Sequence, residues 1–331
     1  MRLFAGLLVS LALLLGACGG TAAQSAKPSG PTKIVVGLSQ TIAQFLPAWV
    51  AKDAGVYARH GLDVDQRTAV ATTIMASLLA NELTLAVTGG PEVLNATANG
   101  ADLVIAGNLA PVAALKFIVP DTIKAKDDIV GKKIGITRLG STTHSNSRAL
   151  FSRIGINPDK DVSYVQLDNT ANTAAALISG QIQGGLMAPP ESTKLTGNGF
   201  HVMYDLSELK FPATGQVIVI PRAWLNGHRD TAQQFVDSLI DARALIGRDR
   251  AVALASLKTG MKLDDPEVAN GVYDYFVGSV LAPVPYTGPE QFANDIEVIA
   301  QATGKLNGFD ANTIIDNSLV KSAEERGLAK P

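Results

Sequence analysis

The chain has 331 residues, of which 47% are hydrophobic and 18% charged, and its formal net charge is −2. This composition predicts a globular protein with a buried core. The near balance of charge argues against nucleic acid or a broadly anionic surface as the partner. Cys18 is the single cysteine, so we expect neither a disulfide nor a cysteine-based zinc site. The four histidines show no spacing typical of metal ligands, and we expect no cofactor.

The first eighteen residues have the layout of a secretory signal. Arg2 precedes an apolar run over 3–15, and Gly16, Ala17 and Cys18 follow. The run is short for a membrane span. The cysteine in this position resembles a bacterial lipobox, in which residues 1–17 are removed and the Cys18 thiol carries a lipid; the alternative is an ordinary signal peptide with an incidental cysteine.

The segment 18–32 is small and polar and is predicted to be a flexible tether. Strand-like and helix-like patterns alternate after it. The strand-like segments are 33–38, 62–65, 83–87, 133–137, 162–165 and 185–187. The helix-like segments between them include 45–57, 145–154 and 171–179. Glycines just past the helical patterns, at Gly61, Gly155 and Gly180, suit the left-handed position that ends a helix. The alternation predicts an α/β fold with mostly parallel sheets.

The sequence after residue 225 has a different pattern. It contains amphipathic helical segments at 230–246, 249–259, 266–280 and 289–303, with no comparable strands between them. Such a helical region can cover an α/β lobe and return the chain to the lobe where it started.

Several phrases of the sequence occur in an order typical of one family. They are 37–41 with 54–64, 128–136 with 140–144, 175–182 with 187–191, and 314–319. Together they resemble the solute-binding proteins of ABC importers, in the group that includes taurine, alkanesulfonate, nitrate and thiamine-precursor binders. The resemblance covers residues 33 to about 320.

This resemblance implies a two-lobed periplasmic-binding-protein fold, type II-like, in which each lobe is a mixed, mostly parallel sheet flanked by helices. We expect lobe 1 to comprise 33–117 plus 220–331 and lobe 2 to comprise 118–219, with crossovers near 116–119 and 216–219. A ligand would sit between the lobes, at the carboxyl ends of the strands.

The function implied is capture of a small solute and its delivery to a membrane permease with its ATPase subunit. The protein is expected to be a monomer, extracytoplasmic and held at the membrane by its lipid. One alternative is a ligand-sensing lipoprotein. The other is an enzyme like the thiamine-pyrimidine synthases of this fold, but this chain lacks their cysteine-rich motif and any recognisable catalytic constellation.

Candidate ligand-binding residues lie in loops after predicted strands, where polar groups and glycines face a ligand. In lobe 1 they are Ser39, Gln40, Gln44, Thr88, Gly89 and Gly90, with Gln216 at the second crossover. In lobe 2 they are Ser141, Thr142, Thr143, His144 and Glu191.

The loop 140–144 precedes a predicted helix, so its amides and hydroxyls suit a carboxylate, sulfonate or phosphate; plain N-capping is the alternative. Arg138 is a weaker candidate for an anion contact. Glu191 could receive a ligand amine or favour a helix dipole. The identity of the solute stays open between small anions, organic acids and neutral heterocycles.

Overall fold

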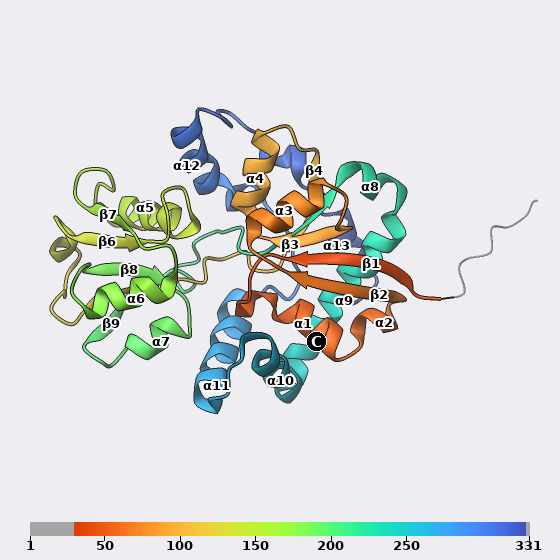
Figure 1. Cartoon of the computed structure of the whole chain (residues 1–331), viewed down its shortest axis with the longest axis horizontal. Helices are drawn as coiled ribbons and strands as arrows, with labels where there is room; N and C mark the ends of the chain where they lie inside the picture. The colour runs from red at the N-terminus through yellow and green to blue at the C-terminus, as the bar shows by residue number, and fades with distance from the viewer. Residues whose placement is uncertain (1–29, 329–331) are drawn as a thin grey trace, which may run out of the picture. The chain divides into compact units, whose positions relative to one another are not determined.

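The computed structural model describes residues 30–328. The predicted signal 1–17 and the lipidation site Cys18 lie outside the described residues. From Pro31 onward the chain forms one compact unit. It contains two five-stranded sheets, with strand orders β2-β1-β3-β10-β4 and β7-β6-β8-β5-β9 (Figure 1). Among the described helices, none is both long and apolar enough to cross a membrane.

The first sheet combines early strands with one late strand. Its strands are β1 (Thr32–Leu38), β2 (Leu62–Thr68), β3 (Leu85–Thr88), β4 (Leu103–Asn108) and β10 (Val217–Pro221). β1 runs parallel to β2 and β3, whereas β10 is antiparallel to β3 and β4. The carboxyl ends of β1, β2, β3 and β4 and the amino end of β10 therefore meet at one edge.

The second sheet repeats this plan. Its strands are β5 (Lys116–Pro120), β6 (Lys133–Ile136), β7 (Ser163–Gln166), β8 (Gly184–Met187) and β9 (Phe200–Asp205). β6 is parallel to β7 and β8, and β5 is antiparallel to β8 and β9. The carboxyl ends of β6, β7, β8 and β9 thus lie at the same edge as the amino end of β5.

Helices cover these sheets and explain their apolar strands. The helices before β5 are η1 (Ala43–Phe45), α1 (Leu46–Asp53), α2 (Val56–Arg59), α3 (Ala71–Leu79) and α4 (Gly90–Ala98). Those between β5 and β10 are η2 (Lys126–Ile129), α5 (Thr142–Ile154), α6 (Thr170–Ile178) and α7 (Glu191–Leu195). Successive residues of β4 enter different cores: Val104 joins one apolar cluster, and Leu103 and Ile105 join another. Alternating side chains of a strand point to opposite faces, so both faces of the first sheet are covered, and a doubly covered strand is apolar throughout.

The chain after β10 is helical, as predicted. Its elements are α8 (Arg222–Gly227), α9 (Arg229–Arg248), α10 (Arg250–Met261), α11 (Pro266–Tyr275), the π-helix η3 (Phe276–Val280), η4 (Pro289–Gln291), α12 (Ala293–Thr303), η5 (Ala311–Ile314) and α13 (Ser318–Glu325). α9 and α10 pack on α1, and α13 packs on β4, which returns the chain to the first sheet. α12 contacts both α4 and α5, and it lies between them in Figure 1.

The predicted helix ends are largely confirmed. Gly155 and Gly180 follow α5 and α6 with φ of 82° and 74°, a region that glycine enters without a steric penalty. The predicted helix 45–57 is instead two helices, because Gly55 takes φ 66° and separates α1 from α2. α5 begins at Thr142, earlier than the predicted 145, because Ser141 caps it.

The structure differs from the expected crossovers. The segments 116–119 and 216–219 fall within or at the start of β5 and β10, which are interior strands of the two sheets. The chain passes from one sheet to the other at 109–115 and returns at 206–216, on the flanks of these strands. A short run of apolar residues is compatible with a buried strand and with a buried connecting segment. Only the pairing partners of the run distinguish the two. The division into two lobes remains a proposal, with boundaries that follow the sheets.

Candidate functional site

Three polar side chains at the edge of the first sheet are buried without a hydrogen-bond partner. Ser39 follows β1, Thr88 ends β3, and Gln216 precedes β10. Their exposed fractions are 0%, 0% and 2%. Among residues 30–328, no group hydrogen-bonds Ser39 Oγ, Thr88 Oγ1 or Gln216 Oε1. Burial of a polar atom without a hydrogen-bond partner lowers the stability of the fold. These three groups therefore do not contribute to stability.

Strand pairing brings these residues together. Leu38 pairs with Val87, which places Ser39 next to Thr88, and Val217 pairs with Thr88. Neighbouring strands lie about 4.8 Å apart. A Cβ on Gly215 would come within 3.4 Å of Gln44 Nε2, so the Gln44 side chain lies beside the residue before Gln216. We call Ser39, Gln44, Thr88 and Gln216 the strand-end site.

Of the two glycines after β3, Gly90 is required by its neighbour. A Cβ on Gly90 would overlap Thr214, and Gly90 donates its N–H to the Thr214 carbonyl at 2.9 Å. A Cβ on Gly89 would meet only the end of the flexible Glu92 side chain. The predicted residue Gly90 therefore has a packing role beside the strand-end site, while Gln40 is exposed.

Glu92 is a candidate that sequence reasoning missed. It lies in the first turn of α4, and burial raises the pKa of its carboxyl, against the lowering effects of its own backbone N–H and of Arg138. Arg138 follows β6 of the second sheet, so the charge of a residue beside the second sheet affects this carboxyl of the first. The available signal was the acidic residue three positions after Gly89, which also reads as an ordinary partner of a helix dipole.

The loop from Thr137 to Thr143 is hydrogen-bonded within itself. Thr143 Oγ1 accepts the Thr137 N–H at 2.9 Å and lies 3.0 Å from Ser141 Oγ. Thr137 Oγ1 donates to Ser141 Oγ at 2.8 Å. Ser141 Oγ also accepts the His144 N–H, which makes it the N-cap of α5. These hydrogen bonds agree with the N-capping alternative for the loop 140–144. Ligand contact by Ser141 or Thr143 stays a prediction.

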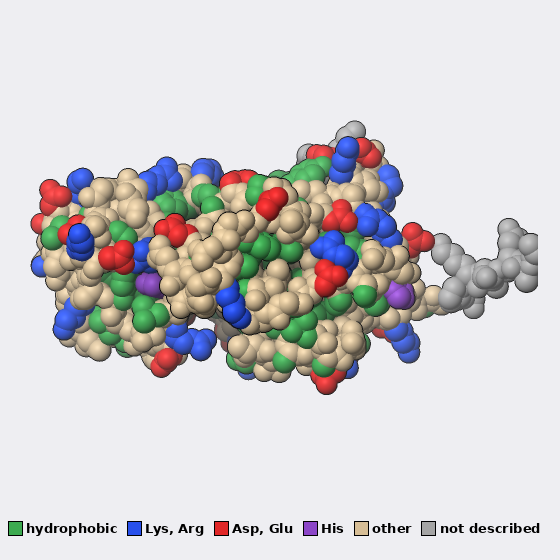
Figure 2. All heavy atoms as spheres, turned by 90° about the horizontal axis from the view of Figure 1, so that it is seen from above, with side chains coloured by type: hydrophobic (Ala, Val, Ile, Leu, Met, Phe, Trp, Pro, Cys, Tyr) green, Lys and Arg blue, Asp and Glu red, His purple; other side chains and the backbone are tan. Residues whose placement is uncertain are grey.

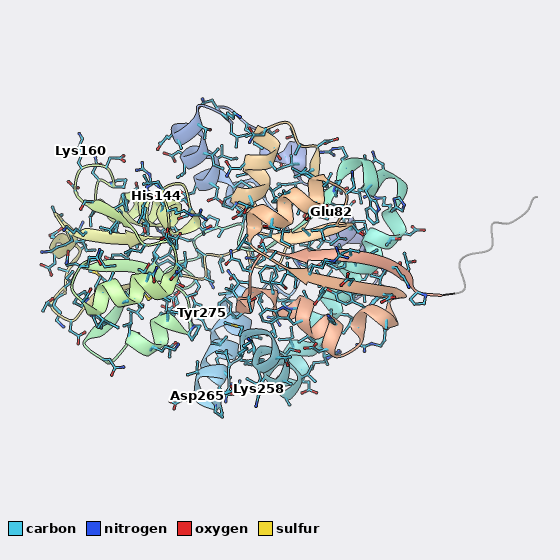
Figure 3. All side chains as sticks on the ribbon, in the orientation of Figure 1. Glu82, His144, Lys160, Lys258, Asp265 and Tyr275 are labelled. Atoms are coloured by element: carbon cyan, nitrogen blue, oxygen red, sulfur yellow. The ribbon has the colours of Figure 1, made fainter. Side chains whose placement is uncertain are left out.

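The remaining residues of this loop have separate environments. Thr142 and Arg138 are exposed. His144 accepts the Gly140 N–H at Nδ1, 3.0 Å away, and its ring meets Tyr164 edge-on, with the ring centroids 4.9 Å apart. Burial and, secondarily, the Arg148 cation lower the pKa of His144. Figure 3 places His144 on α5. A neutral His144 that accepts at Nδ1 keeps a single donor, at Nε2.

The end of β8 reaches the first sheet's core. Ala188, directly after β8, packs against the apolar cluster that contains Leu38 and Val87. Glu191 begins α7 and is half-buried. Its neighbour Ser192 is 1% exposed, and its hydroxyl has no partner among residues 30–328. Ser192 is a second candidate that sequence reasoning missed, although it sits next to a predicted residue.

Asp295 connects the two sheets. This residue of α12 accepts a hydrogen bond from Thr214 Oγ1 at 2.8 Å and one from Ser145 Oγ of α5 at 3.1 Å. It is 8% exposed. Burial raises the pKa of Asp295 to about 6, although both hydroxyl donors lower it, and the nearby Glu92 charge raises it further.

A second polar contact joins the C-terminal helices to the second sheet. Tyr275, at the end of α11, donates to Asp205 Oδ1 at 3.2 Å, and Lys116 Nζ lies 3.4 Å from Asp205 Oδ2. The same ammonium lies 4.5 Å from the centroid of the Tyr275 ring. Figure 3 shows Tyr275 at the side of α11 that faces the second sheet.

The structure thus places Ser39, Gln44, Thr88 and Gln216 on adjoining segments at one edge of the first sheet, with the Glu92 carboxylate beside Gly89. Among the described residues, no cluster of three or more histidine, cysteine or acidic side chains could hold a metal. Figure 2 shows basic and acidic side chains interspersed over the face that it presents. Polar groups gathered at a sheet edge in this way are compatible with a binding site for a small molecule.

Comparison with known proteins identifies the family. Residues 42–245 match the family model described as NMT1/THI5 like. The chain belongs to the NMT1/THI5-like family. A curated relative is a binding protein, YtlA of Bacillus subtilis (strain 168), which is 24% identical over 231 residues that cover 68% of this chain and 69% of YtlA.

Solved structures share the fold of this NMT1/THI5-like chain at low sequence identity. The periplasmic aliphatic sulphonate binding protein SsuA from Escherichia coli is 19% identical, with a TM-score of 0.72, over 88% of this chain and 100% of SsuA. The periplasmic nitrate-binding protein NrtA from Synechocystis PCC 6803 is 14% identical, with a TM-score of 0.62, over 89% of each chain. These likenesses establish the periplasmic-binding-protein fold, as expected from the sequence.

Proposed function

We propose that this chain is the extracytoplasmic solute-binding component of an ABC importer. It captures a small solute between two lobes and delivers it to a permease with its ATPase subunit. The observation that carries this proposal is the strand-end site, where Ser39, Thr88 and Gln216 are buried without partners. A bound ligand would satisfy these groups, which explains why their burial is tolerated. Membership in the NMT1/THI5-like family and the fold shared with SsuA and NrtA support it.

The mechanism is a shift of population between open and closed forms. Asp295 and Tyr275 supply contacts that join the sheets. A ligand that touches both lobes only in the closed form stabilises that form by its differential affinity. On the second lobe, Ser192 and Glu191 after β8 and the first-turn amides of α5 are the groups we propose for this role. The bound solute leaves chemically unchanged, since we propose binding without catalysis.

The test is capture of a small molecule. The chain from Pro31 is purified, incubated with a protein-free small-molecule extract of bacterial cells, desalted and examined by native mass spectrometry. We expect one retained compound, and a rise in melting temperature that grows with ligand concentration. Replacement of both Ser39 and Thr88 by alanine should remove the adduct while the circular dichroism spectrum stays unchanged. Absence of any retained compound and of any thermal shift would contradict the proposal.

The lipid anchor is a separate proposal. Lipidation at Cys18 would hold the binder at high local concentration near its permease. Expression of the full chain in a bacterial host, followed by membrane fractionation and mass spectrometry of the N-terminal peptide, tests it. We expect a lipid-modified cysteine at the N-terminus and loss of the membrane-bound fraction in Cys18→Ala. An unmodified thiol in the mature protein would rule the anchor out.

A further inference from the structure

The chemistry of the first sheet's edge restricts the kind of ligand it can hold. The segments that form this edge are 39–44, 68–70, 88–92, 108–110 and 214–216, and their one charged residue is Glu92. An anionic ligand group at this edge would meet a carboxylate and no lysine or arginine of these segments. Like charges brought together in a partly desolvated site disfavour binding.

The N-terminus of α4 offers no replacement for the absent cation. A helix N-terminus attracts anions through its free N–H groups. Here Glu92 itself lies in the first turn, and its carboxylate lies beside Gly89, the residue before the helix. The Gly90 N–H is also used, because it donates to the Thr214 carbonyl at 2.9 Å. The protein's own anion therefore occupies the place that a sulfonate or nitrate-like group would need.

The unpartnered atoms at this edge can act as acceptors. Gln216 Oε1 is an acceptor, and the hydroxyls of Ser39 and Thr88 accept as well as donate. All three residues are at least nine-tenths buried. Together with the Glu92 carboxylate they form a set that N–H groups of a ligand would satisfy.

Charges from the other elements do not reverse this balance. Arg138, across from Glu92 on the second sheet, is exposed, and its charge is partly screened by solvent. Asp295 of α12 adds a second carboxylate near Glu92. The neighbourhood of Glu92 thus contains two carboxyl groups and one solvated guanidinium, which favours a hydrogen-bond donor over an anion.

We propose that the strand-end site, with Glu92 as the specificity-determining residue, selects a ligand group that donates N–H hydrogen bonds, such as an ammonium, amidine or amide, over a sulfonate or nitrate-like anion. This inference rests on the proposed function, which requires only that some small solute is bound. It differs from what the names of SsuA and NrtA state for those proteins.

The experiment compares matched probes and matched variants. Binding of hexylammonium and benzamidine is compared with that of hexanesulfonate and benzenesulfonate by calorimetry, and the compound retained from the cell extract is identified by mass spectrometry. The variants are Glu92→Gln, which keeps size and removes charge, and Glu92→Asp, which keeps charge and withdraws the carboxylate. Glu267→Gln is the control, because Glu267 is an exposed acidic residue in the first turn of α11.

The expected result is a retained compound with at least one N–H donor, and preference for the nitrogen probe within each pair. Glu92→Gln should weaken binding by about tenfold or more, because it replaces a charge-assisted hydrogen bond, whereas Glu267→Gln should not change it. A retained sulfonate or other compound without N–H groups, bound as well or better by Glu92→Gln, would overturn the inference and leave the proposed function standing. Failure of every probe and of the extract to bind would remove both.

Discussion

The edges of the two sheets carry similar residues, but the hydrogen bonding of these residues differs. At the first edge, the hydroxyls of Ser39 and Thr88 are buried and unpartnered among the described residues. At the second edge, the hydroxyls of Ser141 and Thr143 bond to each other and to backbone N–H groups. Ser39 and Thr88 follow or end a strand, whereas Ser141 caps α5 and Thr143 lies in its first turn.

This difference supports the proposal that the first edge binds a ligand, whereas the second edge caps a helix. A hydroxyl that caps a helix makes its hydrogen bonds within the fold and contributes to stability. A buried hydroxyl without a partner lowers the stability of the fold, and a hydrogen bond to a bound ligand would offset this loss. Sequence position alone made the 140–144 loop look like the stronger site, whereas the hydrogen bonds favour the first edge.

The largest expected effect lies at Asp295, where the two edges are connected. Its pKa rises from 3.8 when unfolded to about 6 in the fold, so the folded state holds a proton that the unfolded state has lost. Its contribution to stability is therefore greatest below about pH 3.8 and falls by about 3 kcal/mol as pH rises to about 6. Urea unfolding of the wild type and of Asp295→Asn at pH 4 and pH 7 measures it.

Asp295→Asn should remove most of this pH dependence, because its amide oxygen still accepts from Ser145 or Thr214 without titrating. The difference between the two proteins isolates Asp295 from the other carboxyl groups. Parallel pH profiles for wild type and variant would show that Asp295 is not the titrating group.

A matched pair of valine substitutions should change stability in opposite directions. Thr143→Val loses bonds to Thr137 and Ser141 and should lower the free energy of unfolding by about 2 kcal/mol. Thr88→Val removes an unpartnered hydroxyl and should leave the ligand-free protein equally stable or more stable by about 1 kcal/mol. Urea denaturation of both variants without ligand tests this. Equal destabilisation of the two variants would contradict the difference in hydrogen bonding between the two edges.

Alanine at the two serines should separate affinity from stability. Ser141→Ala removes the N-cap of α5 and should cost about 1 kcal/mol of stability with unchanged binding of the retained compound. Ser39→Ala should keep stability within about 0.5 kcal/mol and weaken binding by several-fold. Calorimetry and urea unfolding on each variant give both values. Weakened binding in Ser141→Ala would indicate that the 140–144 loop contacts the ligand.

The smallest effect is expected at Arg138. Its side chain is exposed, and it affects Glu92 through its charge. Arg138→Gln should change the free energy of unfolding by less than about 0.5 kcal/mol. A large loss of ligand affinity in this variant, measured by calorimetry, would place an anion contact on the second sheet.

Much of the fold could be predicted from local signals. The alternation of strand-like and helix-like segments gave the α/β class, and glycines such as Gly155 and Gly180 marked helix ends because few other residues adopt their φ. The helical character after residue 225 was also visible, since amphipathic spacing is a property of the sequence itself. The split at Gly55 was missed because the apolar spacing continues across it.

The candidate site could be predicted only in part. Ser39, Thr88 and Gln216 were found because they adjoin strand ends, which meet at an edge in this kind of sheet. Glu92 and Ser192 were not found, because an acidic residue or a serine in a first helical turn is common for local reasons.

The sequence by itself determined the fold class, the helical ending and which loops adjoin the strand ends, because these depend on local spacing and backbone preference. The tertiary structure alone decided that 116–119 and 216–219 are interior strands, which hydroxyls are satisfied, and which charges face Glu92. Most of these depend on partners that are distant in the sequence, such as Ser145 and Asp295. Hydrogen-bond satisfaction and burial are properties of neighbours in space, and a sequence read along the chain does not contain them.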